Sequence, residues 1–239
     1  KNIYPGSNSS DPIDYTRAGS KIYFVATTAA EGRELWVTDG TPGGTQLAWD
    51  TLAGNGSYPY YNVTNLGGSA LFVTNKQLWK SDGTPAGTSL LATFSSYLGT
   101  AESMPVVNGI AFFSADDGAT GHEMWRTDGA LAGTYRLVDA NAGAENGFTS
   151  QGFNMPVAGS KAIFSATTEL GYDVLYSTDG TIAGTAITDV AYTGANDGSY
   201  PGNLAQVNGK IFLGADDGYT GTELFLTDGT NSGTSRVRD

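Results

Sequence analysis

The sequence predicts an all-β fold, a five-bladed β-propeller of four-stranded antiparallel blades, on three observations. A twelve-residue pattern recurs five times, first as ELWVTDGTPGGT at 34–45. Each copy holds four short strand-like segments separated by glycine-rich turns. An aromatic residue stands three positions before the Asp-Gly pair in every copy. An open array of β-repeats is the alternative that the same pattern allows.

The Asp-Gly pairs mark the repeat. Their aspartates are 43, 46, 51 and 49 residues apart, and they are Asp39, Asp82, Asp128, Asp179 and Asp228. Periods of this length are typical of propellers and solenoids. We therefore expect a single repeat domain over 1–239, with blades at approximately 1–51, 52–96, 97–142, 143–192 and 193–239.

Four strands per copy are clearest in the last one, which reads NLAQV, KIFLGA, TELFLT and TSRVRD between its turns. The first of these turns, Asn208-Gly209, favours a two-residue hairpin because both residues tolerate positive φ, and Asn108-Gly109 does the same. The longest connections run from the fourth strand of one copy to the first strand of the next, as at 50–60. A repeated four-stranded meander with a longer crossing segment is the chain order of a propeller blade.

The aromatic residues predict how the blades pack. Along the strand of the first copy, Trp36 points away from Leu35 and Val37, so both faces of the sheet need cover. Blades packed face to face supply that cover, with one large ring per blade filling the wedge between neighbours. The C-terminal RVRD joined to the N-terminal KNIYPGS is comparable to RLVDANAG at 136–143, which predicts that the two ends of the chain meet.

Composition excludes several classes of partner. The net charge of −12 and the pI near 4.3 argue against nucleic acid, whose binding needs clustered Lys and Arg. No apolar run is long enough to cross a bilayer, so no membrane insertion is expected. The absence of cysteine excludes disulfides and thiolate metal sites. The sequence lacks an initial Met and a signal-type apolar segment, which favours a processed or excised soluble piece.

The repeated ELWVTDGT block resembles the bacterial ELWxxDGT repeat family, which occurs as tandem arrays in secreted and cell-surface proteins. All five copies carry the resemblance, and it is strictest at Asp-Gly and at the later Gly-Thr. The departures from the pattern are Gln77, Val174, Tyr176, Phe225 and Ala130. The resemblance implies an extracellular or cell-surface location in a bacterium, and it implies no activity.

The DGTxxGT segment has a structural explanation. Glycine after Asp adopts backbone angles closed to other residues, and the carboxylate accepts hydrogen bonds from main-chain amides two or three positions on. Since the segment occurs in every copy, whereas a catalytic site needs asymmetry, we interpret the five aspartates as structural turn residues. A binding role is the alternative.

Catalytic patterns are weak, and we expect no enzyme. His122 is the single histidine, and neither GxSxG nor HExxH is present, so we interpret His122 as a solvated turn residue. A glycosidase needs two carboxylates. Asp14 is the one acid inside a predicted first strand, which leaves the propeller axis without an obvious pair.

Calcium is the metal that the sequence favours, and no other cofactor is suggested. Oxygen-rich acidic loops suit this cation. The DDGxxGxE loops supply the candidate ligands Asp116, Asp117, Glu123, Asp216, Asp217 and Glu223. The alternative is a pair of solvated hairpins, since the loops lack the EF-hand spacing.

The candidate ligand-binding residues lie in the segments that lead into the first strands, at 56–62 and 198–203. Loops on a rigid scaffold are common binding positions. Aromatic rings there would stack on sugars and amides would bond hydroxyls, and these residues are Tyr58, Tyr60, Tyr61, Asn62, Tyr200 and Asn203. The alternative is that Tyr-Pro packs the crossing segment.

These observations favour a non-catalytic extracellular recognition module that binds carbohydrate or a cell-surface protein through loops on one propeller face. Several similar loops around one face allow multivalent attachment. A structural or adhesive spacer in a larger exported protein is the alternative, and a glycoside hydrolase is a third, less favoured class.

Overall fold

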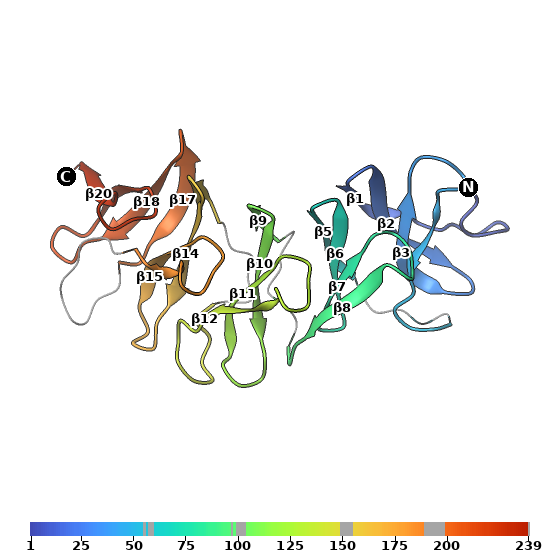
Figure 1. Cartoon of the computed structure of the whole chain (residues 1–239), viewed down its shortest axis with the longest axis horizontal. Coiled ribbons are helices and arrows are strands. Elements are labelled where there is room, and N and C mark those ends of the chain that lie inside the picture. Colours follow the sequence, from blue (N-terminus) through green and yellow to red (C-terminus); the bar gives the residue numbers. More distant parts are fainter. Residues whose placement is uncertain are drawn as a thin grey trace.

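A computed structural model of the chain describes residues 1–54, 56, 60–96, 98, 104–148, 155–188 and 199–238, without the side chains of 60–62 and 238. The regular secondary structure of the described residues consists of β-strands. These strands form five antiparallel four-stranded sheets, which we call blades 1 to 5 (Figure 1). The predicted fold class is therefore confirmed.

Each blade uses four consecutive strands as a meander. Blade 1 consists of β1 (Ile13–Ala18), β2 (Lys21–Thr28), β3 (Gly32–Thr38) and β4 (Gln46–Trp49). Blade 2 consists of β5 (Tyr60–Leu66), β6 (Ser69–Thr74), β7 (Gln77–Ser81) and β8 (Thr88–Thr93). Blade 3 consists of β9 (Val106–Val107), β10 (Ile110–Asp116), β11 (His122–Thr127) and β12 (Tyr135–Val138). Blade 4 consists of β13 (Val157–Ala158), β14 (Lys161–Thr167), β15 (Asp173–Thr178) and β16 (Ala186–Ile187). Blade 5 consists of β17 (Gly202–Val207), β18 (Lys210–Asp216), β19 (Thr222–Thr227) and β20 (Ser235–Arg238).

The predicted Asn-Gly hairpins form as expected. Asn108 and Gly109 have φ of 52° and 77°, and Asn208 and Gly209 have φ of 51° and 75°. Both residues of each turn are thus in the left-handed region that two-residue hairpins need. These turns fix the pairing of the first two strands in blades 3 and 5.

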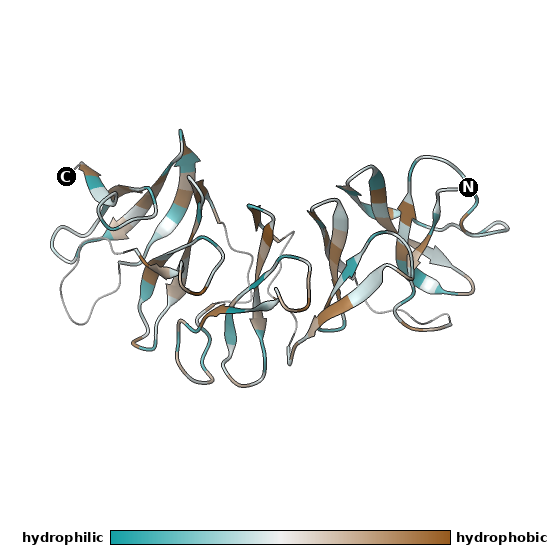
Figure 2. Ribbon diagram, viewed as in Figure 1, coloured by the Kyte–Doolittle hydropathy of each residue, from teal (hydrophilic) through white to brown (hydrophobic). Residues whose placement is uncertain are grey.

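The predicted ring positions face each other across the two central strands of each blade. The cross-strand partners are Phe24 and Trp36, Phe72 and Trp79, Phe113 and Trp125, Phe164 and Tyr176, and Leu213 and Phe225. We call the side of a blade that carries this pair its aromatic face and the opposite side its aliphatic face. Figure 2 shows hydrophobic residues running along these strands.

Neighbouring blades pack the aliphatic face of one against the aromatic face of the next. Between blades 1 and 2, Leu35 and Val37 lie in one buried cluster with Phe72, against which Trp79 packs. The same arrangement builds the clusters between blades 2 and 3, 3 and 4, and 4 and 5. At least one large ring per blade therefore fills each wedge, as the sequence predicts, and a second ring faces it in blades 2 to 4.

Residues at the end of the fourth strand, or just after it, also contribute rings to the wedges. Trp49, at the end of β4, lies 5.0 Å from the ring of Trp79. Phe94, just after β8, lies 5.1 Å from Trp125 in an edge-on contact. These two rings thus add apolar surface where blades 1 and 2, and blades 2 and 3, meet.

The array is open, so the prediction that the two ends of the chain meet is wrong. The blades follow one another along an arc, with the N-terminus and the C-terminus at opposite ends (Figure 1). The first strands β1 and β5 contact each other, and first strands line the hollowed edge of the arc. The packing between neighbouring blades rotates each one too little for blade 5 to reach blade 1.

Candidate functional site

The DGT turns share one hydrogen-bond pattern in all five blades. The Asp Oδ1 accepts the backbone N–H of the residue two positions on, at 2.8–2.9 Å. In four blades the Thr at that position also donates its hydroxyl to the same oxygen, at 2.7–2.8 Å. This hydroxyl bond is the first cause that lowers the pKa of Asp39, Asp82, Asp179 and Asp228. The carboxylates of the turns are therefore engaged by their own loop.

The later glycine of DGTxxGT is required by space. A Cβ built on Gly44, Gly87, Gly133, Gly184 or Gly233 would lie 2.0–2.2 Å from the Asp carboxylate of the same turn. A side chain at this position would push the carboxylate away from its donors. The glycine next to Asp has positive φ in each turn, between 84° and 93°.

A buried glutamate holds the crossing segment in two blades. In blade 1, Glu34 accepts the backbone N–H of Thr51 at 2.9 Å. In blade 3, the two oxygens of Glu123 accept the N–H groups of Ala140 and Gly147, each at 2.8 Å. Both carboxylates are completely buried. Burial raises the pKa of Glu123 to about 7, against the opposing effect of the two backbone donors.

The predicted calcium loops donate backbone hydrogen bonds to their own aspartates. Asp117 Oδ1 accepts the N–H groups of the two residues at 119 and 120, and Asp217 Oδ1 does the same at 219 and 220. Asp116 and Asp216 each accept the N–H of the glycine two positions on, at 2.6 and 2.7 Å. These backbone bonds lower the pKa of Asp217, and main-chain donation from Ala119 is the first cause that lowers that of Asp117.

The side chains of the two glutamates of the predicted calcium loops, Glu123 and Glu223, accept no hydrogen bond from the described loop backbone. Glu123 uses both oxygens on the crossing segment, whereas Glu223 is half-buried on β19. Within the described part of the chain, no three His, Cys, Asp or Glu side chains gather closely enough to hold a metal ion. Neither loop thus gathers its three candidate ligands into a metal site.

Of the predicted ligand-binding residues, Tyr58 and the side chains of Tyr60, Tyr61 and Asn62 lie outside the described residues. Tyr200 is 52% exposed and meets the ring of Tyr172 edge-on, with 6.3 Å between centroids. Asn203 is exposed on β17. Both have positive φ, 43° for Tyr200 and 54° for Asn203, beside a bulge in that strand.

His122 is half-buried at the start of β11, so its interpretation as a solvated turn residue is wrong. Its Nε2 lies 2.9 Å from Ser96 Oγ, and its Nδ1 lies 3.4 Å from Ser114 Oγ. A Ser–His pair of this length suits nucleophilic catalysis, but the Nδ1 partner is a neutral hydroxyl instead of the carboxylate that orients a catalytic histidine.

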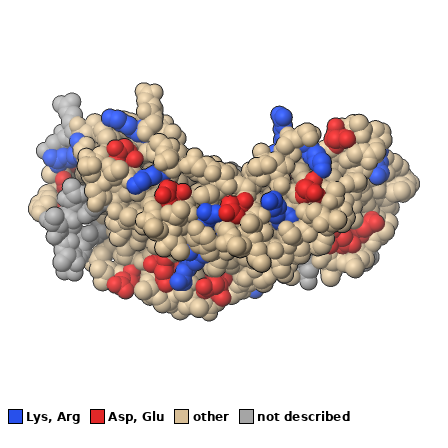
Figure 3. Space-filling view, in the orientation of Figure 1, with Lys and Arg blue, Asp and Glu red and all other residues tan. Residues whose placement is uncertain are grey.

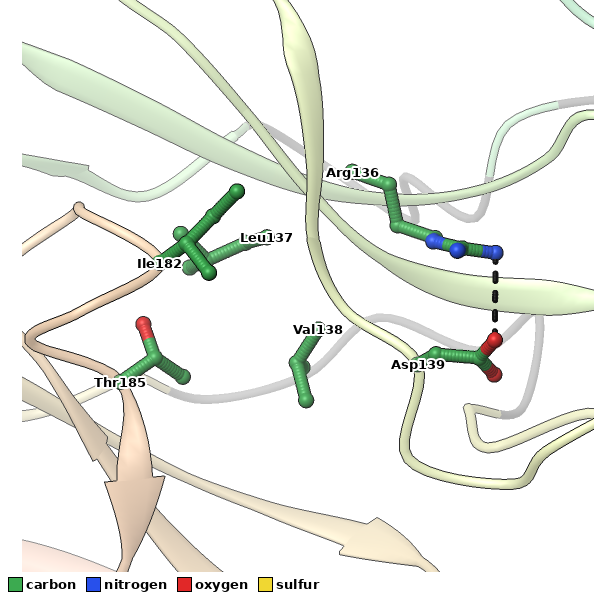
Figure 4. Close-up of a pocket in the computed structure, with 6 residues that line it drawn as sticks. All are labelled: Arg136, Leu137, Val138, Asp139, Ile182 and Thr185. Atoms are coloured by element: carbon green, nitrogen blue, oxygen red, sulfur yellow. Dashed lines mark ion pairs between the residues drawn. The ribbon is translucent and has the colours of Figure 1, made fainter.

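A cavity of about 340 Å³ opens between blades 3 and 4 (Figure 4). Its lining comes from β12 and the residue after it, and from the DGT turn of blade 4: Arg136, Leu137, Val138, Asp139, Ile182 and Thr185. Two blades contribute to the lining, and the repeat motif covers only its blade 4 side, at Ile182 and Thr185. The cavity was therefore missed by sequence reasoning.

The walls of this cavity differ in chemistry. On one side Arg136 and Asp139 form an ion pair with 3.3 Å between Nη1 and Oδ2, and both side chains are partly exposed. On the other side Ile182 and Thr185 come from the turn of blade 4, and Ile182 is exposed. The cavity thus offers charged donors and acceptors opposite an apolar surface. Its volume lies at the lower end of the range for small-molecule sites, about 300–1,000 Å³.

The visible surface carries charges of both signs interspersed, without one continuous basic patch (Figure 3). In the part of the chain that the structure describes, no helix has the length and apolar character that a bilayer crossing requires.

Comparison with solved structures bears on the fold. The chain is similar to a Mycobacterium tuberculosis puromycin-hydrolyzing peptidase, at 10% identity and a TM-score of 0.50, over 88% of this chain and 35% of that one. This chain has a fold of the β-propeller type.

Weaker similarities extend over most of the propeller chain. Puromycin hydrolase matches at 16% identity with a TM-score of 0.42, over 98% of this chain and 39% of that one. TolB from Acinetobacter baumannii matches at 15% identity with a TM-score of 0.42, over 90% and 51%. The chain therefore spans well under two thirds of these proteins. No family model and no curated protein matches it.

Proposed function

We propose that this propeller is a non-catalytic recognition module that binds a carbohydrate in the cavity between blades 3 and 4. The observation that carries the proposal is the pairing of the Arg136–Asp139 ion pair with the apolar Ile182 across one open cavity. Sugars present hydroxyl groups at their edges and C–H groups on their faces. Arg136 would donate to hydroxyl oxygens, Asp139 would accept from hydroxyl groups, and Ile182 would cover an apolar face.

An extracellular or cell-surface location belongs to the same proposal. Its support is the resemblance of the repeats to the ELWxxDGT family, which occurs in exported proteins. The acidic net charge of −12 also suits a neutral ligand better than a polyanion. The ligand that fits these two points is a neutral glycan of a cell surface.

The direct test is a glycan array with the 239-residue chain, followed by titration calorimetry on each glycan that binds. Arg136→Gln and Asp139→Asn are expected to weaken binding at least about tenfold, since each removes a charged hydrogen-bonding group. Arg236→Gln is the matched control. Arg236 occupies the same position on β20 and also forms an ion pair, 3.3 Å from Asp217, but no further turn covers it.

Two results would reject the cavity as the site. Binding that survives both cavity variants but is lost in Tyr200→Ala would move recognition to the exposed ring before β17, the second candidate. No binding to any glycan at high protein density would favour the structural or adhesive spacer.

The non-catalytic part of the proposal has its own test. A polysaccharide or ester hydrolysed by the chain, with the activity abolished in Asp14→Asn or Ser96→Ala, would show an enzyme. The expected result is no hydrolysis, because the Ser96–His122 pair lacks an orienting carboxylate on Nδ1.

A further inference from the structure

The aliphatic face of blade 5 is half of a blade interface without its other half. One position on the third strand of each blade shows this most directly. In blades 1 to 4 it is completely buried against the next blade, at Leu35, Leu78, Met124 and Leu175. In blade 5 the same position is Leu224, and it is 47% exposed.

Two further positions repeat the contrast. At the end of the first strand, the residue is buried in blades 1 to 4, at Ala18, Leu66, Val107 and Ala158, but Val207 of blade 5 is 51% exposed. On the fourth strand, or just beyond it in blade 4, the residue is buried at Ala48, Leu91, Leu137 and Thr188, but Val237 is 43% exposed. Three apolar side chains on the aliphatic face of blade 5 are thus open to water, whereas the matching residues of blades 1 to 4 are buried.

A lysine on this face also lacks the hydrogen bond that its counterparts in blades 1 and 4 make to the next blade. In blades 1 and 4, the Lys that begins the second strand donates to the DGT turn of the next blade. Lys21 Nζ lies 2.6 Å from Asp82 O, and Lys161 Nζ lies 3.2 Å from Gly229 O. Lys210 holds this position in blade 5. It is exposed and has no hydrogen-bond partner among the described residues.

The other end of the array presents the complementary half. Tyr15 on β1 stacks on Phe24, with 5.8 Å between ring centroids, and is 63% exposed. The same position in blade 2 is Val63, which is buried against blade 1. The aromatic face of blade 1 is therefore open at Tyr15.

The N-terminal segment takes the place of a crossing segment on this face. Ile3 packs on the cluster of Phe24 and Trp36. Phe94 and Phe148 do the same on the aromatic faces of blades 3 and 4. Phe24 and Trp36 are buried in this arrangement, so Tyr15 is the ring of this face that stays exposed.

We propose that the aliphatic face of blade 5 docks on the aromatic face of blade 1 of a second copy of this chain, head to tail. The occupant follows from continuity, since four interfaces within the chain already join an aliphatic face to an aromatic face. Lys210 then donates to a backbone carbonyl of the first DGT turn of the partner. Such an interface joins two different surfaces, so it builds chains or rings of copies.

The test is sedimentation velocity of the full chain over a wide concentration range. Wild-type protein is expected to form oligomers whose size grows with concentration. Leu224→Asp buries a carboxylate in the interface and is expected to weaken association about 100-fold or more. Val207→Lys acts on the same face as a second variant, and far-ultraviolet circular dichroism checks that each variant is folded.

Mixing two variants tests the orientation. Leu224→Asp leaves the aromatic end intact, and Tyr15→Asp leaves the aliphatic end intact. Each is expected to be monomeric alone, and a mixture is expected to stop at a 1:1 dimer. Leu170→Asp, at an apolar residue that is exposed in a loop of blade 4, is the control and should assemble like wild type.

Three outcomes would overturn the proposal. Wild-type protein that stays monomeric at all concentrations excludes the second copy and leaves these faces to another occupant. Association that Leu224→Asp and Val207→Lys leave unchanged places the interface elsewhere. A mixture that grows beyond the dimer, or forms none, excludes the head-to-tail arrangement.

Discussion

Glu123 is expected to make the fold less stable as the pH rises from about 5 to about 7. Burial raises the pKa of its carboxyl from 4.5 to about 7, although Ala140 and Gly147 donate to it. Between these values the folded chain keeps a proton that the unfolded chain has released. Stability falls with pH wherever the folded state binds more protons. At about 1.4 kcal/mol per pH unit, this interval corresponds to a loss of about 3 kcal/mol in the free energy of unfolding.

The assay is urea unfolding of wild type and Glu123→Gln from about pH 5 to about pH 8, where the glutamine cannot titrate. The stability of wild type relative to the variant should fall by about 3 kcal/mol across this range. Glu223→Gln, at the same repeat position but half-buried, is the matched control and should keep the wild-type profile. Parallel curves for wild type and Glu123→Gln would refute the reasoning, because the carboxyl would then titrate alike in both states.

Three further substitutions test the turns and the core by urea unfolding. Asp82→Ala should lower the unfolding free energy by about 1 kcal/mol, through loss of the turn hydrogen bonds, and leave glycan binding unchanged. Gly87→Ala should lower the unfolding free energy by about 1–2 kcal/mol, because its Cβ would lie 2.2 Å from the Asp82 carboxylate. Gly43→Ala, whose Cβ would have nothing within 4 Å, should cost less. Equal effects of the two substitutions would reject the steric explanation. Leu175→Ala should lower the unfolding free energy by about 3 kcal/mol, because Leu175 is fully buried. Leu224→Ala should lower it by under about 1 kcal/mol in dilute solution, because Leu224 is exposed. Similar losses for the two variants would contradict the open face of blade 5.

The fold was predictable from sequence because its determinants are local. The Asn108-Gly109 turn, the Asp-Gly turns and the alternation around Trp36 each fix a short segment, and the repeat period joins the segments into meanders. The hydrogen bonds that Asp39 accepts from Thr41 also follow from neighbouring residues. Five copies of the same strand and turn pattern then give five blades.

Closure could not be predicted in the same way. Each wedge is filled independently, by Trp49 on Trp79 in one case and by Phe94 on Trp125 in another. The rotation from blade to blade depends on the size of these packed groups and adds up over four interfaces. The similarity of the joined chain ends, RVRD and KNIYPGS, to the segment at 136–143 carries no information about this total rotation.

The candidate site was harder to predict than the fold. Arg136 and Asp139 stand in blade 3, whereas Ile182 reaches them from the turn of blade 4, so the cavity has no contiguous signature. The sequence predicts Glu123 as a calcium ligand because it follows the acidic loop DDGATGH. The recurrence of Glu five residues before the Asp, at 34, 123 and 223, was the available signal for its role on the crossing segment.

The central claim, an open array with free end faces, is tested most directly by a distance between spin labels. The chain has no cysteine, so labels can be placed singly. A label pair at Arg17→Cys and Gln206→Cys reports the distance between blades 1 and 5. A second pair at Arg17→Cys and Asn65→Cys reports the distance between the neighbouring blades 1 and 2. All three residues are exposed and hold the same position of the repeat. In a Leu224→Asp background that keeps the chain monomeric, the 17–206 distance should be much longer than the 17–65 distance. Equal distances would show a closed ring and contradict the account.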